Sequence, residues 1–209
     1  MAKEFHEEFH KNERIVMFSD GVFAIVVTLL VLELRVPPIT DELSSVELLT
    51  ALIAMKQKFI SFVLSFLFVV MLWVSHNIWF RTLVKTNTTV MWLNNLFLLL
   101  VCFIPFPTAL IGEYPGNSTA MIIFGINWML IGIVMWYVGR YCFHAGFVSQ
   151  HVDYKRYGEA IRIMGFLLAT NIIPIFIAYY YPLVSLGIYI CFNLTGIYVS
   201  FRIRLSKVN

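Results

Sequence analysis

Charged residues are scarce in this chain of 209 residues: they make up only 13% of it, while hydrophobic residues make up 60%. A soluble domain has about 25% charged and 45–50% apolar residues. The apolar excess extends along the whole chain, which excludes a water-soluble protein and leaves no room for a separate soluble domain. The formal net charge of +3 is small and scattered, and it argues against a nucleic-acid-binding surface.

Catalytic motifs and cysteines are equally sparse. The chain has no nucleophile elbow, zinc-protease motif or glycine-rich phosphate loop, so we predict that it is not an enzyme. His144 and His151 lie near Asp153 but lack a third ligand at useful spacing, so we expect no metal site and no cofactor. The cysteines lie inside apolar runs, where we interpret them as buried hydrophobic residues: Cys102, Cys142 and Cys191.

Long apolar stretches separated by short polar links are what the chain has in abundance. A helix needs about 20 apolar residues to cross a hydrocarbon core of about 30 Å. The pattern therefore predicts an all-α integral membrane protein with six transmembrane helices in one domain, residues 1–209. We place the spans at about residues 15–34, 48–79, 91–111, 119–141, 161–180 and, after a turn at 181–182, onward to about 201.

Basic residues gather in alternate links, namely the N-terminal segment, residues 81–85, residues 140–162 and the C-terminal tail. The positive-inside rule then places both termini in the cytoplasm. The first thirteen residues lack a signal-peptide pattern, so we expect the first span to be its own uncleaved insertion signal. Lys56 and Lys58 are expected to snorkel to the headgroups, and Pro105 is expected to bend the third span.

The first span carries polar residues in its first turns: Arg14, Ser19 and Asp20. An ionisable group at membrane depth costs about 2.5 kcal/mol or more unless it is paired or hydrated. His76, late in the second span, and Asn94, early in the third, lie at the same depth. We therefore predict one polar network joining these groups. Such a network is either structural, holding the helices together, or a proton relay through His76 and Asp20.

A stripe of apolar residues also runs along the first span. At about 100° per residue, Ser19 and Asp20 lie about 120° and 140° away from it, on opposite sides. These two residues would thus face other helices and support the stripe from behind. The stripe itself is either ordinary packing or the wall of a pathway. Its members are Phe18, Ile25, Leu29 and Leu32.

The motif Arg14-x-x-x-Phe18-Ser19-Asp20, followed at once by an apolar run, resembles the first helix of the TMEM175 family of potassium channels. The resemblance extends to Trp73-x-x-His76, to Asn94 and to the six-span layout. It implies the prokaryotic form, in which a single six-helix unit assembles as a homotetramer in the cell membrane, with potassium as the permeant ion. Only membrane lipids and further copies of the chain are then expected as partners.

The resemblance also implies roles for individual residues. The family has no backbone-carbonyl filter and constricts its pore with apolar rings from the first helix, here Ile25, Leu29 and Leu32, with the Thr28 hydroxyl nearby. Ile25 stands where relatives carry leucine. Weak to moderate selectivity for potassium over sodium is expected. The residues that would brace this helix are Arg14, Phe18, Ser19, Asp20, Trp73, His76 and Asn94.

Two other functions remain open. One is a proton-coupled transporter or proton-conducting channel that uses Asp20 and His76; the lack of paired half-repeats and of matching broken helices argues against a transporter. The other is a structural membrane protein that conducts nothing.

Overall fold

Apolar stretches of this length fold into helices because hydrocarbon offers no hydrogen-bond partner to the backbone. The computed structural model describes residues 2–38, 40 and 44–192, with side chains from residue 12 onward. The helices are α1 (Ala2–Leu29), η1 (Leu30–Glu33), α2 (Ser45–Ala54), α3 (Lys56–Phe80), α4 (Thr88–Cys102), α5 (Pro105–Glu113), α6 (Ser118–His144), α7 (Tyr154–Thr170) and α8 (Ile172–Tyr180).

Five helical segments in this part of the chain are long and apolar enough to cross a membrane. The prediction of an all-helical membrane protein is therefore confirmed. The predicted sixth span falls on the shorter apolar helix Pro182–Phe192 and on residues 193–209, which lie outside the described residues. The five segments are Asn12–Glu33, Lys56–Phe80, Thr88–Glu113, Ser118–His144 and Tyr154–Tyr180.

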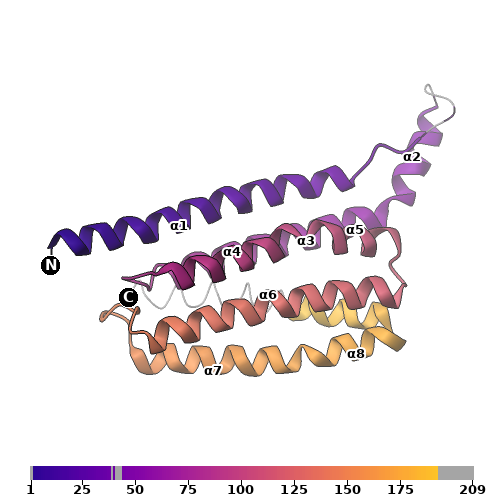
Figure 1. Ribbon diagram of the computed structural model, residues 1–209. Helices are drawn as coiled ribbons and strands as arrows, with labels where there is room; N and C mark the ends of the chain where they lie inside the picture. Colours follow the sequence, from indigo (N-terminus) through magenta and orange to yellow (C-terminus); the bar gives the residue numbers. More distant parts are fainter. Residues whose placement is uncertain (1, 39, 41–43, 193–209) are drawn as a thin grey trace, which may run out of the picture.

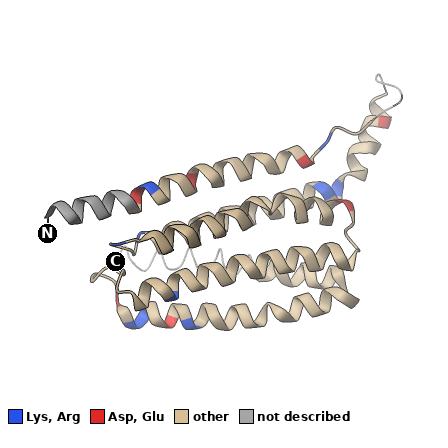
Figure 2. Ribbon diagram, in the orientation of Figure 1, with Lys and Arg blue, Asp and Glu red and all other residues tan. Residues whose placement is uncertain are grey.

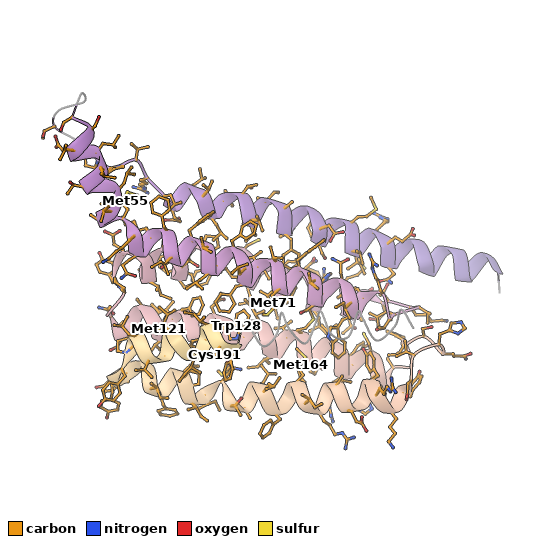
Figure 3. The ribbon with its side chains drawn as sticks, turned by 180° about the vertical axis from the view of Figure 1, so that it is seen from behind. Met55, Met71, Met121, Trp128, Met164 and Cys191 are labelled. Carbon is orange, nitrogen blue, oxygen red and sulfur yellow. The ribbon has the colours of Figure 1, made fainter. Side chains whose placement is uncertain are left out.

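The long helices lie side by side in layers, with α1 at one edge of the bundle and α7–α8 at the opposite edge (Figure 1). α1 packs on α3 and α4, α4 and α5 pack on α6, and α6 packs on α7 and α8. The core between the layers holds side chains such as Trp128 and Met164 (Figure 3). The buried Phe97 belongs to the same core. Charged residues lie mainly towards the two ends of the bundle, as a membrane-spanning protein requires (Figure 2).

Two spans are interrupted where proline removes a backbone donor. α4 ends at Cys102 and α5 begins at Pro105, so the expected bend in this span is confirmed. Likewise, α7 ends at Thr170, and Pro174 lies four residues later. Proline lacks the N–H that would bond the carbonyl four residues before it, and its ring clashes with that carbonyl.

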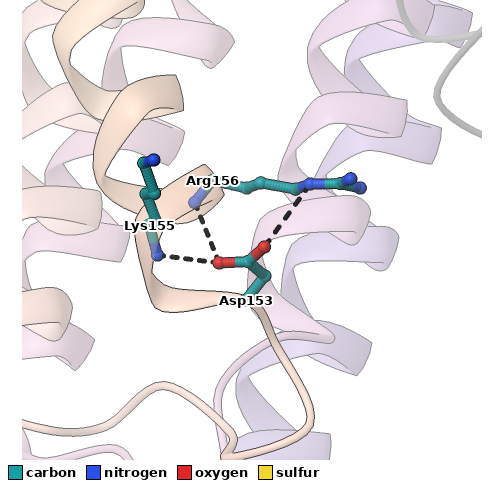
Figure 4. A network of polar contacts seen from close by, with 3 residues as sticks. All are labelled: Asp153, Lys155 and Arg156. Atoms are coloured by element: carbon teal, nitrogen blue, oxygen red, sulfur yellow. Dashed lines mark hydrogen bonds and ion pairs between the residues drawn. The ribbon is translucent and has the colours of Figure 1, made fainter.

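Two predicted helix starts are wrong. The second span does not start near residue 48, because α2 turns away from α3 at Met55 and forms a separate short helix (Figures 1 and 3). The fifth span starts at Tyr154 and not near 161. The Asp153 carboxylate caps α7 by accepting from the backbone N–H groups of Lys155 (2.9 Å) and Arg156 (3.3 Å) (Figure 4). This cap keeps a charged sequence helical.

The cysteine prediction is correct for one residue only. Cys142 is buried in the core between α6 and its neighbours, whereas Cys102 and Cys191 are exposed on the protomer surface. An apolar run does not determine burial in a membrane protein, because its outer surface is also apolar.

Candidate functional site

The helix α1 has one face buried against α3 and α4. Its buried residues recur at helical spacing, so they form a single stripe. Phe23 and Val26 join Val69, Phe97 and other apolar side chains in the core. The full set is Ile15, Ser19, Phe23, Val26 and, in η1, Leu30. Only Ser19 is polar, so its hydroxyl needs a partner inside the protein.

The opposite face of α1 is open in the protomer. Ile25, Leu29 and Leu32 are 60%, 43% and 66% exposed, and Phe18 lies on the same face. A Cβ added at Gly21 would meet no described side chain or other element within 4 Å, apart from its own stretch of helix. The Thr28 hydroxyl, also on this side, donates to the Ile25 carbonyl at 2.7 Å. The open face is therefore apolar, with one hydroxyl and little bulk at Gly21.

Behind this open face, a chain of hydrogen bonds joins α1 to α4 and α3. The Ser19 hydroxyl donates to the Ile15 carbonyl (2.8 Å) and accepts from the Asn94 amide N–H (3.0 Å). Asn94 Oδ1 lies 2.9 Å from His76 Nε2. Because that oxygen can only accept, His76 Nε2 carries the proton and donates it. All three side chains are buried, and the chain of donors and acceptors is continuous.

His76 lies among aromatic rings. It stacks on Phe80 with the ring centroids 4.2 Å apart and on Phe97 at 5.5 Å, and Phe23 of α1 lies 5.9 Å away. Its other ring nitrogen, Nδ1, has no hydrogen-bond partner in the described part of the chain. These contacts fix the imidazole plane and direct its one polar bond towards Asn94.

A second hydrogen-bonded group joins α1 to α3. The Asp20 carboxylate accepts from the Trp73 indole N–H at 2.8 Å and from the Asn77 amide at 3.3 Å. Asp20 is half-buried, at the edge of the contact. No hydrogen bond joins Asp20 to His76 in the part of the chain that the structure describes.

The sequence therefore predicted one network where the described residues form two. Ser19 and Asp20 are consecutive, so the helix directs their side chains about 100° apart, one to α4 and the other to α3. Arg14 is exposed and makes no side-chain bond to a described residue. Phe18 lies on the open face and not in either group.

Three further contacts were missed from the sequence. Asn12 donates to the carbonyls of Phe80 (3.2 Å) and Leu83 (3.1 Å), which ties the start of the first span to the end of α3. Ser65 and Thr108 share a buried hydrogen bond of 2.7 Å between α3 and α5. Lys58 forms an ion pair with Glu113, which links α3 to the end of α5. Each contact links positions at least 43 residues apart, for which the sequence has no local signal.

A bundle of membrane-length helices with buried polar contacts between them defines a polytopic α-helical membrane protein. The sequence profile of the family described as the endosomal/lysosomal potassium channel TMEM175 matches residues 14–105. This range includes α1 from Arg14 onward, all of α3 and α4, and every residue of both hydrogen-bonded groups. Over these residues the chain is similar to the TMEM175 family.

Individual relatives agree with this assignment. A potassium channel of Chamaesiphon minutus is 38% identical over 130 residues, which cover 61% of this chain and 64% of that protein. A potassium channel of Streptomyces collinus is 33% identical over 126 residues, 60% of each chain. The matches thus span less than two thirds of these two relatives. The crystal structure of a lysosomal potassium-selective channel TMEM175 homolog from Chamaesiphon minutus superposes with a TM-score of 0.81 and 27% identity, over 91% of this chain and 98% of that one.

Proposed function

We propose that this chain is one subunit of a passive potassium channel whose pore is lined by α1. The observation that carries the proposal is the contrast between the two faces of α1. One face is anchored to α3 and α4 by two sets of hydrogen bonds, and the other presents Ile25, Leu29 and Leu32, which no described element of the protomer covers. The potassium channels among the relatives support the same assignment.

In the proposed assembly, four subunits place their α1 helices around a common axis. Each subunit has six spans, and both termini lie in the cytoplasm. The excess of basic residues at residues 81–85 and 140–162 supports that orientation. The edge position of α1 in the bundle supports a place for this helix at a subunit interface (Figure 1).

Conduction through such a pore depends on its apolar rings. A narrow ring of leucine and isoleucine side chains loses its water and blocks ions until it widens. Potassium sheds its hydration shell at lower cost than sodium, so a ring that forces partial dehydration favours potassium. The Thr28 hydroxyl lies one turn from the Leu32 position and supplies an oxygen to a partly dehydrated ion. Ser19, Asp20, Trp73, His76 and Asn94 act by holding α1 at a fixed rotation, so that these side chains keep facing the axis.

A flux measurement tests the proposal. The purified protein is reconstituted in liposomes, and the reversal potential is recorded with potassium and sodium gradients in opposite directions. A potential that follows potassium is expected, with sodium permeating less. Protein-free liposomes provide the control. A reversal potential that follows an imposed proton gradient would support a proton pathway instead, and the absence of any current would leave a structural protein.

The proton alternative needs a continuous path of exchangeable groups. His76 and Asp20 belong to separate hydrogen-bonded groups, and His76 is enclosed by Phe23, Phe80 and Phe97. This arrangement favours a structural role for His76. Comparing potassium and proton fluxes in His76→Gln and in the parent protein separates the two functions, because a relay would lose only its proton flux.

A further inference from the structure

A cavity of about 330 Å³ opens between the end of α6 and the start of α7, on the far side of the bundle from α1 (Figure 1). Three cationic side chains line it: Arg140 from α6, and Lys155 and Arg162 from α7. His144 adds a fourth nitrogen-bearing group, and no carboxylate is among the described lining residues. None of the three cations forms an ion pair with a described residue. The cavity therefore concentrates positive charge that the described residues do not neutralise.

The walls of this cavity are built and held in place. The Phe143 ring stacks on Tyr157 with the centroids 5.7 Å apart, and the Tyr154 hydroxyl donates to the Val148 carbonyl at 3.3 Å. Arg140 has its guanidinium 5.7 Å from the centre of the Trp136 ring, which limits where the charge can move. Gly158 of α7 also lines the cavity.

Exposed apolar side chains continue from the cations towards the middle of the membrane. On α7, Phe166 lies on the same face as Lys155 and Arg162 and is 69% exposed. On α6, Tyr137 and Ile133 lie one and two turns from Arg140 and are also exposed. The surface thus has a cationic end and an apolar strip that runs from it towards the middle of the membrane. This arrangement complements the anionic headgroup and the apolar acyl chains of a phospholipid.

We propose that this cavity binds the phosphate headgroup of an anionic membrane lipid, with the acyl chains along Phe166, Tyr137 and Ile133. The positive-inside rule accounts for basic residues at this end of the bundle but not for their convergence on one cavity. Basic pockets between membrane helices on the cytoplasmic side are suited to such headgroups. The proposal rests on the proposed function, in which α1 faces the axis and both termini are cytoplasmic; α7, at the opposite edge of the bundle, then faces lipid (Figure 1).

Arg156 provides a matched control. It is the residue after Lys155, so it points about 100° away around α7. It pairs with Asp153 at 3.4 Å and does not line the cavity (Figure 4). Arg156→Gln therefore removes the same charge at the same end of the helix without touching the proposed site.

Native mass spectrometry of the detergent-solubilised full chain tests the site. Phosphatidylglycerol or phosphatidylcholine is added, and the lipid retained per protomer is counted. The parent should retain phosphatidylglycerol in preference. Lys155→Gln and Arg162→Gln should each weaken retention by roughly fivefold, since a basic residue near an anionic surface contributes about 1 kcal/mol. Arg156→Gln should retain as much as the parent.

A variant that keeps every charge separates the cavity from diffuse attraction. Gly158 lines the cavity, and a Cβ there would lie 3.6 Å from the Phe143 ring, an ordinary contact. Gly158→Leu should therefore fold and add bulk to the lining of the cavity. We expect it to lose phosphatidylglycerol as the cation variants do. Equal loss in Arg156→Gln, unchanged retention in Gly158→Leu, or no preference over phosphatidylcholine would overturn the proposal.

Two further results show whether the ligand is a lipid or a free anion, and whether a negative result concerns this site or the proposed channel. Inorganic phosphate at millimolar concentration should not displace the lipid; if it does, the cavity is a site for a free anion, and the lipid assignment is wrong. Lipid retention is measured by mass spectrometry, so it does not depend on ion conduction. A chain that conducts potassium but holds no lipid overturns this site alone, and a chain that holds lipid but conducts nothing overturns only the proposed channel.

Discussion

The two edges of the bundle, α1 and α7–α8, both expose apolar side chains but are attached to the interior differently. α1 is held by side-chain hydrogen bonds to other side chains on α3 and α4. The α7–α8 span is held by close packing, as at Gly165, where an added Cβ would lie 3.0 Å from Trp136 Nε1. It is also held by bonds to backbone carbonyls, such as Trp136 Nε1 to Ile161 at 3.1 Å.

The difference shows what each kind of contact controls. In hydrocarbon there is no hydrophobic force between helices, so close packing brings α7 next to α6. A hydrogen bond between two side chains has a preferred direction, and two such bonds on different sides of α1 also determine its rotation. A helix that faces lipid can rotate slightly without consequence. A helix whose side chains form part of a pore ring cannot rotate in this way, because rotation would change which side chains form the ring.

The largest effect is expected from breaking the buried chain of hydrogen bonds. Asn94→Ala leaves the His76 N–H without an acceptor and should lower the free energy of unfolding by about 2–4 kcal/mol. The control is Asn171→Ala, because Asn171 is also buried (8% exposed, against 2% for Asn94) but its amide bonds only the Leu167 carbonyl of its own span. Thermal unfolding in detergent compares them, and equal losses would contradict the special role of α1.

The next largest effect is expected on conduction, and only for substitutions on α1. Leu29→Ser lowers the barrier to wetting an apolar ring, so it should raise single-channel conductance or open probability severalfold and weaken selectivity. Leu167→Ser on α7 replaces a leucine of similar exposure, 50% against 43%, and should leave conduction unchanged. Single-channel recordings decide the matter, and a pore that responds to Leu167 but not to Leu29 would place the pathway elsewhere.

A smaller effect is expected at the edge of the contact. Asp20→Ala removes the acceptor of Trp73 and Asn77 and should cost about 1–2 kcal/mol, less than Asn94→Ala because water can reach the half-buried position. Subunit assembly, followed by size exclusion, should suffer more than ion selectivity. Ser118→Ala, which removes one exposed bond to the Tyr179 carbonyl, should change neither. An intact assembly with altered selectivity would mean that Asp20 faces the ions.

The smallest effect concerns the open face itself. No other described element lies within 4 Å of a Cβ added at Gly21, so Gly21→Ala should stabilise α1 by up to about 1 kcal/mol through helix propensity. Gly139→Ala should destabilise α6, because its Cβ would lie 2.6 Å from the Trp79 ring. Both shifts can be read from thermal unfolding. Destabilisation by Gly21→Ala would show that the open face of α1 is closely packed in the assembly.

Most of the architecture could be predicted from the sequence because the relevant signals are local. Runs of apolar residues identify membrane helices, and Pro105 marks a bend in the sequence itself. The stripe of Ile25, Leu29 and Leu32 follows from helical periodicity, and the structure leaves these side chains uncovered in the protomer. The need of Ser19 and Asp20 for partners follows from the cost of unpaired polar groups in hydrocarbon.

The choice of partner was decided only by the tertiary structure. Ser19 bonds Asn94 at a separation of 75 residues, and Asp20 bonds Trp73 at a separation of 53. Which polar group meets which depends on the rotation and tilt of each helix, set by the packing of the whole bundle. The same holds for the ion pair of Lys58 and Glu113 and for the separation of α2 from α3 at Met55. Hydropathy measures how strongly a segment prefers the membrane, and it contains no information about the direction in which a side chain points.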